Sequence, residues 1–176
     1  MTDSPARRAR IARMIRVDQA GEFGAARIYA GQLAVLGNRH PVARDIAHMA
    51  DQEARHRKFF DQMMVKRRVR PTLFAPFWNI AGFALGAATA ALGPRAAMAC
   101  TAAVETEIDR HYGKQLEQLG DTDPELSAAI TEFRAEELEH KAAALAAGAE
   151  ATPDYPLLSG AIRAGCRAAI ALAKRI

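Results

Sequence analysis

The sequence predicts an all-α fold, a bundle of four long helices built from a helix pair that occurs twice. The composition is half hydrophobic, rich in alanine and only 6% aromatic, which favours helices over strands. No stretch alternates regularly between apolar and polar residues, and no Asn-Gly or Asp-Gly hairpin turn occurs. Apolar residues instead recur at spacings of three and four, as on one face of a helix. With 176 residues, the chain is expected to form one domain over 1–176.

The first predicted helix begins at Ser4-Pro5, because serine caps a helix and proline fits its first turn. It continues to Leu36 and ends at Gly37-Asn38, a typical helix stop. The second helix begins at Pro41 and ends near Arg67. These two helices form the first predicted pair.

A segment without charged residues, 71–94, follows the first pair and is flanked by Arg70 and Arg95. It is long enough to be a candidate transmembrane helix. However, its hydrophobicity is moderate, and a spanning helix would place the two helix pairs on opposite sides of the membrane. We therefore expect a connecting helix that lies in the membrane interface or covers one end of the bundle. A helix buried in the core is the alternative.

The second pair begins with a helix over about 95–119, which ends at Gly120. Asp123-Pro124 caps the next helix, which ends at Gly148. A final helix begins near Pro156 and runs to the C-terminus.

The two pairs are an internal repeat. Counting from Glu22, an arginine, a tyrosine and a glutamine lie at offsets of 5, 7 and 10, and the same residues lie at the same offsets from Glu105. Glu22 precedes Glu53 by 31 residues, and Glu105 precedes Glu137 by 32. Glu107 lies about 200° round the helix from Glu105 and falls off its apolar face. Glu105 is therefore the counterpart of Glu22.

Each pair carries a Glu-x-x-His step, whose carboxylate and imidazole share one helix face. One such step alone is more typical of a solvated surface. Two steps with one glutamate from each of two other helices are the ligand set of a ferritin-like di-iron or di-manganese bundle. The predicted metal ligands and catalytic residues are Glu22, Glu53, His56, Glu105, Glu137 and His140.

Four carboxylates and two neutral imidazoles would balance the charge of two divalent cations, as a buried site requires. A ligand set without thiolates suits iron or manganese better than a structural zinc. Asp18, on the face of Glu22, is predicted to accept a hydrogen bond from a ligand histidine. Tyr112 is expected to be a core residue beside the site, and His111 an exposed or outer residue rather than a ligand.

The net charge of +4 suits an anionic surface. The positive residues cluster in 7–16 and 66–70 without interleaved aromatics, which argues against nucleic acid as a partner. The second cluster adjoins the apolar segment and indicates anionic lipid. Cys100 and Cys166 form no Cys-x-x-Cys pair, and we recognise no signal peptide. We expect a bacterial protein in a reducing compartment, on the cytoplasmic side.

Four regions resemble the demethoxyubiquinone hydroxylase family of ubiquinone biosynthesis, and the resemblance covers nearly the whole chain from about Arg16. The regions are Val17-Asp18-Gln19-Ala20-Gly21-Glu22-Phe23-Gly24-Ala25 with 27–32, 103–105 with 111–112, Phe133-Arg134-Ala135-Glu136-Glu137-Leu138-Glu139-His140, and 164–170.

The resemblance implies a ferritin-like monooxygenase that uses O2 to hydroxylate the ring of demethoxyubiquinol, 2-polyprenyl-3-methyl-6-methoxy-1,4-benzoquinol. It implies two iron ions on the six predicted ligands, with Glu53 and Glu137 bridging. A polyprenyl substrate implies peripheral association with the cytoplasmic face of the bacterial inner membrane, and the family implies a lipid-binding partner protein. We expect 71–94 and the last helix to form the lipid entry. The electron donor, a reductase or the quinol itself, stays open, as does a homo-oligomer.

Two other functions are compatible with parts of the sequence. Ferritins and rubrerythrins, which oxidise iron or scavenge peroxide, share this ligand set. The lack of a rubredoxin-like Cys-x-x-Cys pair and the presence of the apolar segment argue against both. A scaffold of a biosynthetic complex is the third option, but a scaffold has no need for four buried carboxylates.

Overall fold

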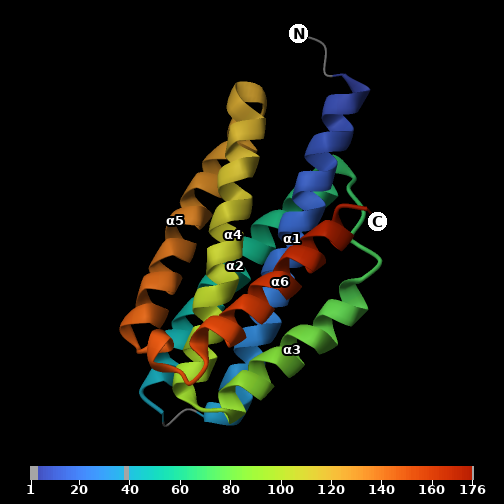
Figure 1. Cartoon of the computed structure of the whole chain (residues 1–176). Helices are drawn as coiled ribbons and strands as arrows, with labels where there is room; N and C mark the ends of the chain where they lie inside the picture. Colours follow the sequence, from blue (N-terminus) through green and yellow to red (C-terminus); the bar gives the residue numbers. More distant parts are fainter. Residues whose placement is uncertain (1–3, 38–39, 176) are drawn as a thin grey trace.

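Four long helices form an elongated bundle, and two shorter helices pack on its outside (Figure 1). The computed structural model describes residues 4–37 and 40–175, and within them every regular element is a helix. The bundle helices are α1 (Pro5–Leu36), α2 (Val42–Arg67), α4 (Pro94–Leu119) and α5 (Pro124–Ala146). The outer helices are α3 (Ala75–Ala91) and α6 (Tyr155–Ala173), and the 3₁₀ turns are η1 (Gly120–Thr122) and η2 (Ala149–Ala151). The predicted all-α bundle is confirmed.

The helix ends follow the local sequence signals closely. The Ser4 hydroxyl accepts a hydrogen bond from the backbone N–H of Arg7 at 3.2 Å, and the Asp123 carboxylate accepts one from Leu126 at 3.2 Å. Gly37 and Gly120 end their helices with positive φ angles of 65° and 47°, which glycine adopts at no steric cost.

Two predicted helix ends differ from the structure, and one falls partly outside the described residues. Asn38, part of the predicted stop of the first helix, lies outside the described residues. α5 ends at Ala146, two residues before the predicted Gly148, and Gly148 itself has a positive φ of 86°. α6 ends at Ala173, so the prediction that the last helix runs to the C-terminus is wrong for the described residues.

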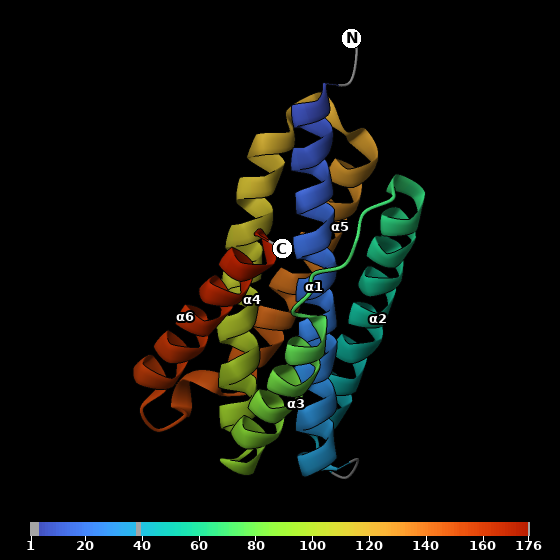
Figure 2. The same cartoon turned by 90° about the vertical axis from the view of Figure 1, so that its right-hand side faces the viewer.

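The outer helices lie on one face of the bundle, where α3 packs along α1 and α6 packs along α4 (Figure 2). α3 therefore lines the side of the bundle rather than covering its end. Glycines allow this close approach: a Cβ on Gly82 would lie 2.9 Å from the Gly24 carbonyl oxygen, and one on Gly86 would meet that of Ile28. Gly31 meets the α3 backbone in the same way. Among the described helices, none combines the length and the apolarity needed to cross a bilayer.

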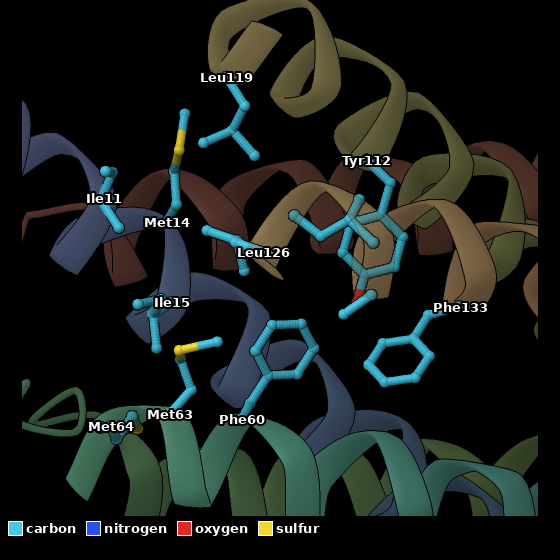
Figure 3. Close-up of a cluster of buried hydrophobic side chains, with 12 residues drawn as sticks. Ile11, Met14, Ile15, Phe60, Met63, Met64, Tyr112, Leu119, Leu126 and Phe133 are labelled. Carbon is cyan, nitrogen blue, oxygen red and sulfur yellow. The ribbon is translucent and has the colours of Figure 1, made fainter. Parts of the chain in front are cut away.

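Two apolar clusters fill the bundle. One joins all four bundle helices (Figure 3) and consists of Ile11, Met14, Ile15, Phe60, Met63, Met64, Tyr112, Leu119, Leu126, Ala129, Ile130 and Phe133. The other consists of Ala25, Tyr29, Ile46, Met49, Met98, Ala99, Ala102, Ala144 and Ala149. Each half of the repeat contributes one tyrosine, Tyr112 to the first cluster and Tyr29 to the second. Both tyrosines direct their hydroxyl groups at buried glutamates, Tyr29 at Glu105 and Tyr112 at Glu22.

Candidate metal centre

The bundle interior holds a cluster of carboxylates and imidazoles. One comes from α1, two from α2, one from α4 and two from α5, and each residue is at most 2% exposed. The cluster consists of Glu22, Glu53, His56, Glu105, Glu137 and His140. The structure thus brings all six predicted ligands together. It does so because each occupies the mid-position of a buried face, and the four faces meet at the bundle axis.

The six side chains form two overlapping groups, within each of which the potential ligand atoms lie within 4.8 Å of one another. The groups are Glu22, Glu53, His56 and Glu137, and Glu53, Glu105, Glu137 and His140. Glu53 and Glu137 belong to both groups. Two cation positions side by side would share these two carboxylates.

Both histidines turn Nδ1 towards the cluster. His56 Nδ1 lies 3.3 Å from Glu22 Oε2 and 3.3 Å from Glu137 Oε1. His140 Nδ1 lies 3.0 Å from Glu137 Oε2 and 3.6 Å from Glu53 Oε1. Neutral imidazole is a common metal ligand, and in both cases the inward nitrogen is the one that would bind.

Many oxygen and nitrogen atoms of the cluster that could bind a metal ion have no hydrogen-bond partner. Of the buried side-chain atoms in the described residues that lack one, six belong to the predicted ligands: Glu22 Oε2, Glu53 Oε1 and Oε2, His56 Nδ1, Glu105 Oε2 and Glu137 Oε1. An unsatisfied buried polar group costs about 1–3 kcal/mol. Divalent cations would satisfy these atoms and neutralise the carboxylates. The donor set therefore fits a pair of hard or borderline metal ions.

Burial and mutual repulsion set the protonation of the cluster. Burial, followed by the charges of neighbouring carboxylates, raises the pKa of Glu53 and of Glu105 well above the usual value. Burial also raises the pKa of Glu137. Burial alone would lower the pKa of His56, but its contacts with Glu137 and Glu22 outweigh it and raise the pKa to about 10. Without cations the cluster therefore retains protons, which metal binding would displace.

Two tyrosines hold the carboxylates that belong to only one group. Tyr112 on α4 donates its hydroxyl hydrogen bond to Glu22 on α1, and Tyr29 on α1 donates to Glu105 on α4 at 2.6 Å. Burial raises the pKa of both tyrosines well above the usual value, so both remain protonated donors. The repeat thus crosses over, since each tyrosine supports the glutamate of the other helix pair.

The outward nitrogens of the histidines contact two residues that the spacing of the sequence did not predict. His56 Nε2 lies 2.7 Å from Glu136 Oε2, and His140 Nε2 lies 2.9 Å from Gln52 Oε1. Gln52 and Glu136 each directly precede the glutamate of a Glu-x-x-His step. That shared position, together with the need of a ligand histidine for an outer acceptor, was the available signal.

Asp18 has a different partner from the one predicted. Its carboxylate is bonded to His111 at 3.0 Å and to Gln115 at 2.8 Å, both on α4. The prediction that Asp18 accepts from a ligand histidine is therefore wrong. The reason is its orientation: Asp18 on α1 faces α4, whereas the ligand histidines come from α2 and α5. His111 serves as the partner of Asp18.

An apolar cavity of about 650 Å³ lies between α1, α3, α4 and α6. Its lining is almost entirely apolar, with small residues such as Gly21 and Gly24 on α1. Ala25, Ile28 and Val104 line this cavity and also a small void beside Glu105. The inner wall of the cavity thus adjoins the carboxylate cluster.

Comparison with known proteins identifies relatives over almost the full chain. The family described as ubiquinone biosynthesis protein COQ7 matches residues 9–173. The chain is 53% identical to the 3-demethoxyubiquinol 3-hydroxylase of Rhodospirillum rubrum, over 98% of this chain and 81% of that protein. It is 53% identical to the human mitochondrial NADPH-dependent 3-demethoxyubiquinone 3-hydroxylase, over 96% and 79%. It is 43% identical to the mitochondrial 5-demethoxyubiquinone hydroxylase of Saccharomyces cerevisiae, over 98% and 81%. These matches confirm the resemblance noted in the sequence.

Proposed function

The chain belongs to the ubiquinone biosynthesis protein COQ7 family, and we propose that it hydroxylates the ring of demethoxyubiquinol at a centre of two iron ions. The hydroxylase activity follows from a family membership that extends over nearly the whole chain. The observation that carries the metal centre is the pair of overlapping ligand groups, with their buried side-chain atoms that lack hydrogen-bond partners, beside a void that shares lining residues with the apolar cavity.

Six residues would hold the two ions. Glu22 and His56 would hold one ion, and Glu105 and His140 the other. Glu53 and Glu137 would be shared by both ions. When bound, two Fe(II) ions would supply the two electrons that O2 needs to hydroxylate the ring, with its second oxygen atom released as water. Tyr112 and Tyr29 fix the orientation of the two terminal carboxylates through their hydroxyl groups. The two apolar clusters of the bundle interior would exclude water from the centre.

The apolar cavity is the proposed binding site of the quinol and part of its polyprenyl chain. Its walls are apolar side chains of four helices, which suits an isoprenoid. A ring that reached the inner end would lie against Ala25 and Val104, next to Glu105. The proposed lipid entry between 71–94 and the last helix would lie between the α3 and α6 residues that line this cavity.

We also propose that the chain associates peripherally with the cytoplasmic face of the bacterial inner membrane. Three large apolar side chains at α3 are exposed, with Leu73 at 78%, Phe77 at 58% and Ile80 at 72%. Leu157 at the start of α6 is 75% exposed. The positive residues of 66–70 precede α3 directly, and such a combination favours an anionic bilayer surface. A lipid-binding partner protein would deliver the quinol at the same face.

A single-turnover assay tests the reaction. The protein is loaded with Fe(II) without oxygen, given short-tail demethoxyubiquinol in detergent, exposed to O2 and analysed by mass spectrometry. We expect a product that has gained one ring oxygen, and none from Glu137→Ala. Iron oxidation with unchanged quinone, also after a lipid-binding partner is added, would contradict the proposal and favour a ferritin-like iron oxidase.

Membrane association is tested separately by vesicle co-sedimentation. Leu73→Asp with Ile80→Asp changes two exposed side chains that do not line the cavity. We expect this variant to lose binding to vesicles of anionic lipid while it keeps turnover of quinol in detergent. Ala128→Asp, on the exposed surface of α5, is the matched control. Equal binding of both variants would refute the assigned surface.

A further inference from the structure

The two halves of the metal centre differ at the pair of equivalent positions that contact the ligand histidines from outside. Gln52 precedes Glu53 in the first Glu-x-x-His step, and Glu136 precedes Glu137 in the second. Each contacts the histidine of the opposite half, Glu136 through His56 Nε2 at 2.7 Å and Gln52 through His140 Nε2 at 2.9 Å. The same place in the repeat therefore holds a carboxylate on one side and a neutral amide on the other.

The surroundings preserve this difference. Arg55 donates to both oxygens of Glu136 at 3.1 Å, which fixes the carboxylate in place beside the imidazole. The Arg55 side chain is 56% exposed, so water screens much of its charge. Gln52 is 8% exposed, and its amide oxygen faces His140 inside the bundle. The tyrosine supports match, because Tyr112 and Tyr29 donate to Glu22 and Glu105 respectively.

A carboxylate that accepts the outer hydrogen bond of an imidazole makes the inner nitrogen a stronger donor, and such outer partners typically change metal affinity 10- to 100-fold. We propose that Glu136 and Gln52 make the two metal positions inequivalent, so that the ion at Glu22 and His56 is held more tightly than the ion at Glu105 and His140. Glu136 and Gln52 are positioning residues in this assignment. The inference rests on the two-metal centre of the proposed function.

The inequivalence has a direction relative to the substrate cavity. The small void that shares Ala25, Ile28 and Val104 with the cavity is also lined by Glu105 and Tyr29. The position with the amide-supported histidine is therefore the one next to the cavity. A tightly held ion would lie on the far side, and the more weakly held ion on the side that the quinol approaches.

Anaerobic calorimetry of the metal-free protein with Co(II), a redox-stable probe, tests the inference. The variants are Glu136→Gln, Gln52→Glu and the double exchange, with Glu132→Gln, an exposed glutamate on the same helix, as control. We expect two unequal steps in the wild type. Glu136→Gln should weaken the tighter step about 10- to 100-fold, and Gln52→Glu should strengthen the weaker step by a similar factor. The double exchange should restore two unequal steps.

Two results would overturn the inference while leaving the metal centre intact: two wild-type steps that differ only by the statistical factor, or equal weakening of both steps by Glu136→Gln. If Glu136→Gln fails to fold, Gln52→Glu still decides, because an unchanged weaker step refutes the assignment. A wild type that binds no Co(II) would overturn the two-metal centre of the proposed function as well. Mössbauer spectra of the iron-loaded wild type should show two distinct iron environments.

Discussion

The first helix of each pair, α1 and α4, has nearly the same inward face but a different outward face. Inwards, Glu22 and Glu105 each have a tyrosine seven residues later and a glutamine ten residues later. The glutamines even contact equivalent positions across the bundle: Gln115 donates to Asp18 at 2.8 Å, and Gln32 to Thr101 at 3.4 Å. The carboxylate cluster thus retains the repeat, because both halves present side chains to the same bundle axis.

The outward faces hold the two cavity walls by different means. Two residues after Glu22 is Gly24, whose backbone is approached closely by Gly82 of α3. Two residues after Glu105 is Glu107, which is 2% exposed and accepts from Arg163 and Arg167 of α6, each at 2.8 Å. One wall is therefore held by close backbone packing and the other by ion pairs. The repeat has diverged where the halves contact different neighbours.

The largest expected effect comes from the shared inward face. Replacement of either residue proposed to bridge the ions, Glu53→Ala or Glu137→Ala, should lower bound iron below two per chain and reduce hydroxylation more than about 100-fold. The two losses should be similar, because both residues belong to both ligand groups. Metal analysis and the single-turnover assay measure this, with the exposed Glu139→Ala as control. Full iron content in either variant would contradict the proposal that both residues are shared by the two ions.

The contact between α3 and α1, which forms one wall of the cavity, should be the next most sensitive to substitution. A Cβ at Gly86 would meet the backbone of Ile28, so Gly86→Ala must push α3 away from α1 and should destabilise the fold by about 3 kcal/mol. Gly160→Ala on α6 has open space around its Cβ position and should be neutral or slightly stabilising. Urea unfolding compares the two. Equal stabilities would show that α3 is not held by this contact.

The contact between α6 and α4, which ion pairs hold together, should tolerate substitution better. Glu107→Gln removes the charge that Arg163 and Arg167 share, but both arginines are 40–48% exposed, so the loss should be only about 1–2 kcal/mol. Because α6 lines the cavity, the KM for quinol should rise while kcat changes little. The exposed Glu117→Gln, also on α4, is the control. A fall in kcat with constant KM would assign Glu107 a different role.

The smallest effect concerns a contact between the halves, where Arg67 at the end of α2 pairs with Asp123 at the start of α5. Burial alone would raise the pKa of Asp123, but Arg67 and the Leu126 N–H outweigh it and hold the pKa below its usual value. A lowered carboxyl pKa stabilises the fold above the unfolded value, about 3.9, and the contribution is lost as the pH falls through the folded value.

Asp123→Asn keeps the cap to Leu126 but removes the charge. It should therefore cost about 0.5–1 kcal/mol at pH 7, and the difference from the wild type should shrink below about pH 4. Thermal unfolding at pH 7 and pH 3 measures this, with the exposed Asp121→Asn as control. A difference that is constant with pH would show that the ion pair does not contribute.

The comparison also shows how far spacing alone reaches. The six cluster residues could be predicted because positions three, four and seven residues apart share one helix face. The outer partners could not, since Asp18 lies on the predicted face but meets His111 of α4 instead of a ligand histidine. Gln52 and Glu136 lie beside the predicted faces, and only the crossing of α2 and α5 brings them to the histidines.

The sequence by itself determined the helices, their repeat and the residues that face the bundle axis, because helix signals and periodicity are local along the chain. Only the tertiary structure decided that α3 packs along α1 through its glycines, and that α6 packs on α4 through Glu107. It also decided that a cavity opens between them beside Glu105. These features depend on which helix surfaces meet, and that is set by side-chain volume and charge on segments far apart in the chain.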